Sequence, residues 1–165
     1  MRTFQEQLFL YCTCHRDRRN FVAHLLCMPM ILVSVLALLS RPNFVLDGVL
    51  VSPASGAIAA VAAYYVTLQR YYGVIMTALL LLAGMFAARL AAYSTLLWLT
   101  VSITLLVLGV VLHRLGHALE GTKHSFFDAA RGILIGPLAA LVGVALVLGY
   151  DDRSREELSG FAGRD

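Results

Sequence analysis

The sequence has few charged residues. Only 14% of its 165 residues are Asp, Glu, Lys or Arg, whereas soluble domains carry roughly 25%. Hydrophobic residues make up 59% of the chain, which leaves too little polar surface to coat a water-soluble fold. The net charge is only +3 and the basic residues are dispersed, which excludes a nucleic-acid-binding surface. The composition therefore predicts a small integral protein of the lipid bilayer.

Cysteine is also scarce, with only Cys12, Cys14 and Cys27. The first two are too close for an ordinary bridge and the odd count leaves one thiol over, so a disulfide framework is not expected. Cys14 lies beside His15, but a Cys-x-Cys pair is a weak metal motif, and a reduced, membrane-proximal pair is the simpler interpretation. A cleavable signal peptide is not expected either, because the first apolar run begins only near Phe21, after a basic segment.

Five apolar runs are candidate membrane helices. They cover Phe21–Leu39, Gly48–Leu68, Tyr72–Ala88, Ser94–Leu112 and Ala129–Tyr150. Gly136-Pro137 interrupts the fifth run, which either crosses the bilayer or turns back within it. We therefore expect an all-α, polytopic membrane helix bundle with four to five transmembrane helices. Residues 1–150 form its single domain, residues 1–20 lie at the membrane interface, and residues 151–165 form a polar, disordered tail.

Three acidic or imidazole side chains follow the fourth run with helical spacing. His113 and His117 are four residues apart, and Glu120 is three residues further on. If the helix continues, they fall within about 60° of one another at ~3.6 residues per turn. Two imidazoles and a carboxylate on one stripe are ligands for a transition metal such as iron, manganese or zinc.

The expected topology brings all five histidines to one side of the membrane. Short loops make neighbouring helices antiparallel, so the start of the first span and the end of the fourth lie on the same side. His15 and His24 lie at the start of the first span, and His113, His117 and His124 lie at or after the end of the fourth. The simpler interpretation of each histidine alone is a solvated side chain at headgroup level, and this holds for His124. Five histidines on one side of the membrane favour a metal site.

The basic residues indicate which side this is. Eight lie on the histidine side and five on the other, and three of those five are in the tail. Because short cytoplasmic loops carry the excess of Lys and Arg, the N-terminus and the metal site are expected to face the cytoplasm.

Two further polar residues have alternative roles. Asn20 lies four residues before His24, so it either orients a ligand through a hydrogen bond or caps the first span. Asp128 either accepts a hydrogen bond from a ligand or caps the fifth run.

Two motifs resemble the family of small membrane proteins that act as 2-hydroxy fatty acid dioxygenases in phytosphingosine breakdown, together with its bacterial relatives. The first motif is Tyr11-x₃-His15-x₄-Asn20-x₃-His24-x₄-Pro29. The second is Gly116-His117-x₂-Glu120-Gly121, followed by Ser125-Phe126-Phe127 and Gly136-Pro137. The resemblance extends from Tyr11 to Leu138, and the second motif has the bacterial form. The family usually has Gln in place of His113 and Pro in place of His124.

The resemblance implies an Fe(II)-dependent oxygenase that removes one carbon from a 2-hydroxy fatty acid by α-oxidation, with O₂ as co-substrate. It makes His15, His24 and His117 the first candidates for catalytic iron ligands, with His113 and Glu120 next. It also implies a multi-pass protein of a bacterial inner membrane. Two other functions stay open from the residues: a non-catalytic metal- or haem-binding membrane protein, and a structural or transport helix bundle. The oligomeric state is not predicted.

Overall fold

Helices account for most of the structure. The computed structural model describes residues 18–46, 49–120, 136–138, 140–145 and 149. Its elements are α2 (Arg18–Ser40), β1 (Phe44–Leu46), β2 (Val49–Val51), α3 (Pro53–Leu68), α4 (Arg70–Ala91) and α5 (Thr95–Glu120). Residues 136–138 and 140–145 are also helical. The predicted all-α membrane bundle is confirmed, with one small hairpin added to it.

Three of the described helices are long and apolar enough to cross a membrane. These spans are Arg19–Ser40, Arg70–Ala91 and Thr95–Ala118, with 22, 22 and 24 residues. They correspond to the first, third and fourth predicted runs. Helix α3 is apolar but has only 16 residues, or about 24 Å at 1.5 Å per residue, which is shorter than the ~30 Å hydrocarbon core.

The prediction of one helix over Gly48–Leu68 was wrong at its start. Strands β1 and β2 pair as an antiparallel hairpin before α3 begins. Ser52 caps α3: its hydroxyl accepts from the Ser55 amide, the Ser55 hydroxyl accepts from the Ser52 amide, and Pro53 occupies the first turn. This cap fixes the helix start because Pro suits the first helical position and its missing N–H needs no partner there.

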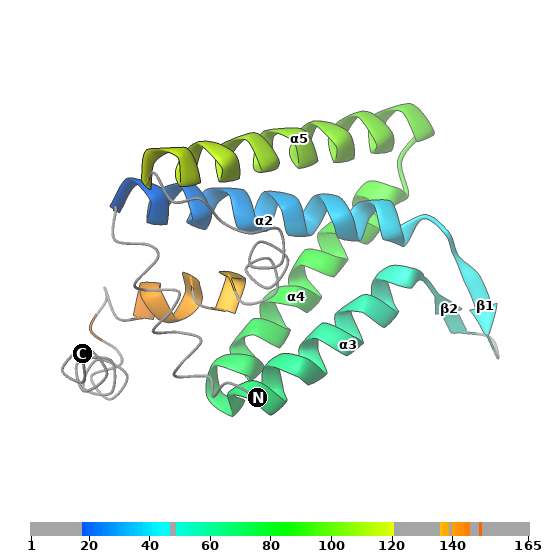
Figure 1. Ribbon diagram of the computed structural model, residues 1–165. Helices are drawn as coiled ribbons and strands as arrows, with labels where there is room; N and C mark the ends of the chain where they lie inside the picture. The colour runs from blue at the N-terminus through cyan, green and yellow to red at the C-terminus, as the bar shows by residue number, and fades with distance from the viewer. Residues whose placement is uncertain (1–17, 47–48, 121–135, 139, 146–148, 150–165) are drawn as a thin grey trace.

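The helices form two antiparallel pairs, α2 with α5 and α3 with α4, and the two pairs meet where α2 packs on α4. Helix α5 runs back along α2, and α3 packs along α4, while α2 also packs on α4 (Figure 1). The start of α2 therefore lies beside the end of α5. The antiparallel arrangement expected for the first and fourth runs is confirmed, because α2 and α5 run in opposite directions.

Small residues allow α5 to lie close against α2. A Cβ added to Gly116 would lie 2.6 Å from Asn20 Oδ1, and one added to Gly109 would lie 3.3 Å from the Cys27 carbonyl oxygen. A step of seven residues along α5 thus matches seven residues along α2 in the opposite direction. Another seven residues along each helix lies a serine, Ser102 on α5 and Ser34 on α2, and both side chains are fully buried. A seven-residue repeat of small interface residues is typical of close, antiparallel helix packing.

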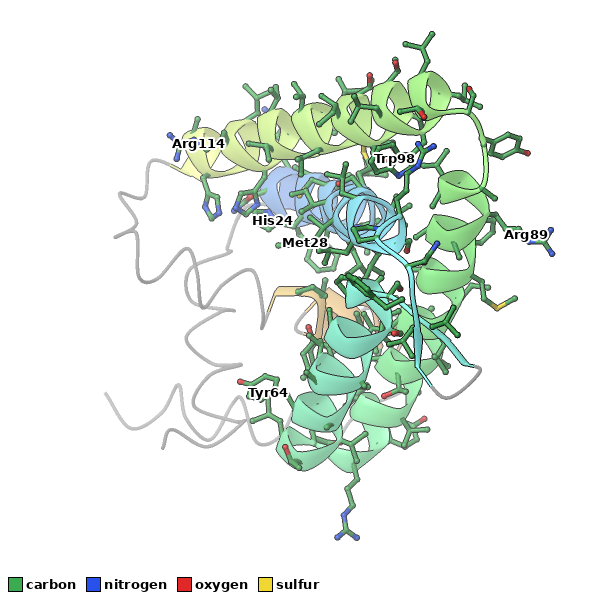
Figure 2. The ribbon with its side chains drawn as sticks, turned by 90° about the vertical axis from the view of Figure 1, so that its right-hand side faces the viewer. His24, Met28, Tyr64, Arg89, Trp98 and Arg114 are labelled. Atoms are coloured by element: carbon green, nitrogen blue, oxygen red, sulfur yellow. The ribbon has the colours of Figure 1, made fainter. Side chains whose placement is uncertain are left out.

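A polar clamp holds the other end of this pair. One further seven-residue step brings Arg41 to Thr95, and the Arg41 Nη2 atom donates to the Thr95 Oγ1 atom over 2.8 Å. The Trp98 indole N–H donates to the Ala37 carbonyl oxygen over 2.8 Å, and the Arg41 guanidinium lies 4.6 Å from the Trp98 ring centroid. Trp98 points from α5 toward α2 in Figure 2. These contacts fix the register of α5 on α2.

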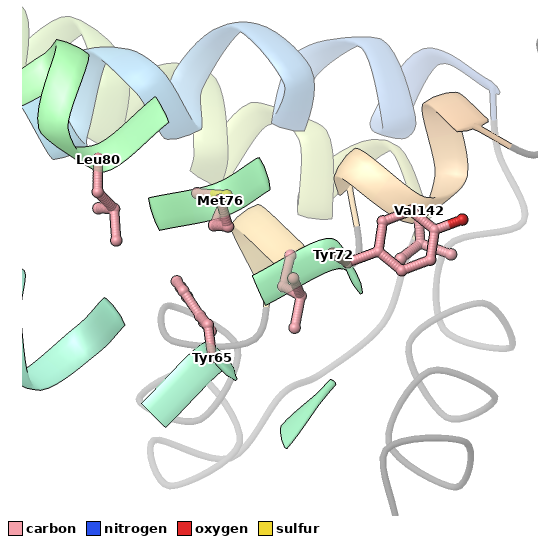
Figure 3. Close-up of a cluster of buried hydrophobic side chains, with 6 residues drawn as sticks. Tyr65, Tyr72, Met76, Leu80 and Val142 are labelled. Carbon is pink, nitrogen blue, oxygen red and sulfur yellow. The ribbon is translucent and has the colours of Figure 1, made fainter. Parts of the chain in front are cut away.

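The largest buried cluster lies between α3, α4 and the helical residues after position 135 (Figure 3). Its members are Tyr65, Tyr72, Met76, Leu80, Leu138 and Val142. The cluster thus ties the described part of the fifth apolar run to the bundle. Whether that run crosses the bilayer stays a prediction.

Gly73 provides a test of this packing. A Cβ there would lie 2.5 Å from the Tyr65 carbonyl oxygen, which is backbone and cannot rotate away. We expect Gly73→Ala to destabilise the protein by about 1–3 kcal/mol, as overpacking does. Gly56 is the control, because a Cβ there meets nothing within 4 Å, and Gly56→Ala should leave stability unchanged or raise it by up to about 1 kcal/mol. Thermal unfolding in detergent would measure both, and equal midpoints would contradict the close α3–α4 contact.

Candidate metal centre

Three histidine rings meet where α2 begins and α5 ends. The ring centroids of His24, His113 and His117 are 4.6–4.8 Å apart in all three pairs, and the rings are T-shaped to one another, at 65–89°. One ligand nitrogen from each lies within 4.8 Å of the others. His24 is buried, with 1% of its surface exposed, and the other two are partly exposed. In Figure 2, His24 lies between the two helices.

Helix periodicity and antiparallel packing together place these rings. Helix α5 continues without a break to Glu120, so the predicted stripe of His113 and His117 is realised on one face. Helix α2 begins at Arg18, and Asn20 and His24 occupy one buried face of it. Because the two helices are antiparallel, residues 89 positions apart in the chain become neighbours.

The protein backbone orients His24. Its Nδ1 atom lies 3.0 Å from the Asn20 carbonyl oxygen. A carbonyl can only accept, so Nδ1 carries the proton and donates it, and the Nε2 atom of the neutral ring keeps its lone pair. Such a hydrogen bond from the far nitrogen is the usual way in which a metal-binding histidine is held. The Asn20 side chain is fully buried beside Gly116.

This donor set fits a transition-metal ion. Two nitrogens bound to one ion at ~2.1 Å are at most ~4.2 Å apart, and the nitrogens here lie within 4.8 Å of one another. Closing around an ion therefore needs a shift of the order of 1 Å in the ring positions. Three imidazoles also leave coordination positions open for other ligands.

The same geometry argues against haem. A porphyrin held by two axial imidazoles lies between their rings. The three rings contact one another in T-shaped pairs, with centroids no more than 4.8 Å apart. No pair among these three leaves room for a porphyrin plane.

The structure tests only some of the predicted site residues. It brings His24, His113 and His117 together and places Asn20 beside them. Three others lie outside the described residues: His15, His124 and Asp128. Glu120 ends α5, but its side chain is not among those described. The proposed roles of these four stay predictions.

Two residues at the site were missed by the sequence analysis. Gly116 lets α5 approach Asn20 and Ala23 on α2, and Cys27 brings its Sγ atom within 3.8 Å of His113 Nδ1. The seven-residue spacing from Ser102 to Gly109 to Gly116 is the signal in the sequence that indicates Gly116. Nothing in the sequence alone indicates the role of Cys27.

Comparison with known proteins supports the resemblance found in the sequence. The family model described as 2-hydroxy-palmitic acid dioxygenase Mpo1-like matches residues 1–147. No curated protein and no solved structure matches the chain. Because the family match covers most of the chain and includes all three clustered histidines, the protein belongs to the Mpo1-like family of 2-hydroxy-palmitic acid dioxygenases.

Proposed function

We propose that the protein is an Fe(II)-dependent dioxygenase that shortens 2-hydroxy fatty acids by one carbon at the cytoplasmic face of the membrane. The observation that carries this proposal is the group formed by His24, His113 and His117 in a membrane protein of this family. His15 and Glu120 complete the proposed ligand set.

The chemistry of the site suits this reaction. Imidazole ligands with no cysteine in the group suit iron, manganese or zinc, and use of dioxygen selects iron among these. Bound Fe(II) would offer open positions to the hydroxyl and carboxylate oxygens of the substrate and to O₂. In the overall balance, R–CH(OH)–COOH and O₂ give R–COOH, CO₂ and H₂O.

The residues of the chain hold the ligands and shape the approach of the substrate. The hydrogen bond from His24 to Asn20 keeps one ring nitrogen ready to bind, and Asp128 is the candidate for a similar role at another ligand. Apolar side chains that flank the histidines face outward, namely Val22, Leu26, Val111 and Leu115. The fatty acyl tail therefore reaches the site sideways from the bilayer while its polar head meets the metal.

A turnover assay tests the reaction. With Fe(II) loaded anaerobically, a 2-hydroxy C16 acid and O₂ should give the C15 acid, detected by mass spectrometry, and a chelator should abolish the product. We expect His117→Ala to lower both turnover and bound iron more than about 100-fold, since even indirect partners of a ligand are worth 10–100-fold. Arg114→Ala is the control, because Arg114 is exposed on the same turn of α5.

The outcomes of that assay separate the competing functions. Iron bound without product would indicate a different substrate or a non-catalytic metal protein. Neither product nor retained metal would contradict the oxygenase and leave the structural or transport bundle.

Gly116→Ala tests whether the contact between α2 and α5 builds the site. The new Cβ would lie 2.6 Å from Asn20 Oδ1 and 3.2 Å from Ala23 Cβ, so α5 must move away from His24. We expect Fe(II) affinity to fall about 10-fold and stability by about 1–3 kcal/mol. Gly73→Ala is the matched control, because it crowds the backbone of Tyr65 in the α3–α4 contact and not the contact between α2 and α5. It should lower stability similarly but affinity less, and equal losses of affinity would contradict a local effect.

Labelling of cysteines tests the orientation. Tyr93 is exposed just before α5, and Arg114 is exposed near its end, about 30 Å away along the helix axis. In a Cys12→Ser, Cys14→Ser background, Tyr93→Cys should react with an impermeant maleimide on intact cells. Arg114→Cys should react only after permeabilisation. The reverse pattern would place the histidines outside the cytoplasm.

A further inference from the structure

Cys27 is a buried thiol beside the histidine group that the proposed reaction does not use. It lies on α2 nearly one turn deeper than His24 and is fully buried. Its Sγ atom is 3.6 Å from the His24 carbonyl oxygen and 3.8 Å from His113 Nδ1. Cys27 is not part of the group of mutually close ligand atoms, which contains the three histidines. The thiol therefore touches one candidate ligand and the backbone of another.

The direction of these two hydrogen bonds follows from their partners. The His24 carbonyl can only accept, so the Cys27 S–H donates to it. The sulfur lone pairs are then left for His113 Nδ1, 3.8 Å away, and this contact is a hydrogen bond when Nδ1 carries the proton. The opposite direction would put the proton of the neutral His113 ring on Nε2, and a protonated nitrogen cannot bind a metal.

We propose that Cys27 is a positioning residue for His113, which it holds with Nδ1 protonated and Nε2 directed to the metal; this rests on the proposed metal site. Cys27 does for His113 what the Asn20 carbonyl does for His24. Both acceptors come from α2, so one helix sets the tautomer of a ligand on each side of the site. The thiol stays protonated and does not bind the metal itself.

The test compares Cys27→Ala, Cys27→Ser and Ser34→Ala. Alanine removes the acceptor, and serine restores one on a shorter bond, which places its oxygen farther from His113. Ser34 is an equally buried small polar residue seven positions deeper on α2. Fe(II) affinity is measured by anaerobic equilibrium dialysis. We expect about a 10-fold loss for Cys27→Ala, partial recovery for Cys27→Ser, and wild-type affinity for Ser34→Ala.

Two further measurements separate positioning from general packing. In metal-free protein labelled with ¹⁵N-histidine, His113 should show the Nδ1-protonated tautomer, and Cys27→Ala should change its ring ¹⁵N shifts while those of His24 stay the same. In a double-mutant cycle, Cys27→Ala should cost little further affinity once His113→Ala is present.

Other results would overturn the proposal. Unchanged affinity and unchanged His113 shifts in Cys27→Ala would show that the thiol does not set the tautomer. Additive losses in the double mutant would show that Cys27 acts through packing. If wild-type protein binds no Fe(II), both the proposed function and the role of Cys27 are contradicted. If Fe(II) binding depends on His117 but not on Cys27, only the role of Cys27 is contradicted.

Discussion

The close antiparallel contact between α2 and α5 is the constraint on which the rest of the structure depends. Imidazole side chains reach only a few ångströms from their backbone, so rings from two helices meet only if the helices lie almost against each other. Gly109 and Gly116 make this possible, because α2 atoms occupy the positions where their Cβ atoms would lie. The repeat of small residues every seven positions keeps the same faces in contact over the whole length of the pair. The site is therefore a consequence of packing along the pair and not only of the residues at its end.

Much of the fold follows from the sequence because the bilayer leaves few alternatives. A chain in hydrocarbon must pair its backbone groups within helices, so long apolar runs predict the existence and order of α2, α4 and α5. The apolar run that predicts α5 stops at Leu112, whereas the helix continues to Glu120. Alternation of the spans then predicts that His24 lies near His113 and His117, and the structure brings these three together. The hairpin before α3 was missed because Val49–Val51 is as apolar as the helix that follows it. The Ser52-Pro53 cap was the local signal that should have moved the start of that helix.

The finer geometry of the site does not follow from the sequence, and the reason is physical. Periodicity says which residues share a face of one helix, but not how that helix is rotated against its neighbour. The approach of Cys27 to His113 and of Asn20 to Gly116 depends on this rotation. The hydrogen bond from His24 goes to the backbone of Asn20, whereas the sequence suggested its side chain. Any residue with this backbone conformation would supply that carbonyl, so side-chain identity could not reveal it.

The two ends of the α2–α5 pair have different structural roles. One end holds the histidine group, and the contacts at the other end fix the register on which that group depends. At one end, buried polar groups such as Asn20 and His24 would be costly in an apolar setting without hydrogen bonds or a bound ion. At the other, Arg41, Thr95 and Trp98 form contacts that depend on one register. A slip of one helical turn would move α5 by ~5.4 Å along α2, more than the 4.6–4.8 Å that now separates the ring centroids. Such a slip would break the clamp and disperse the histidines together, so the contacts at the far end of the pair also keep the candidate metal ligands in place.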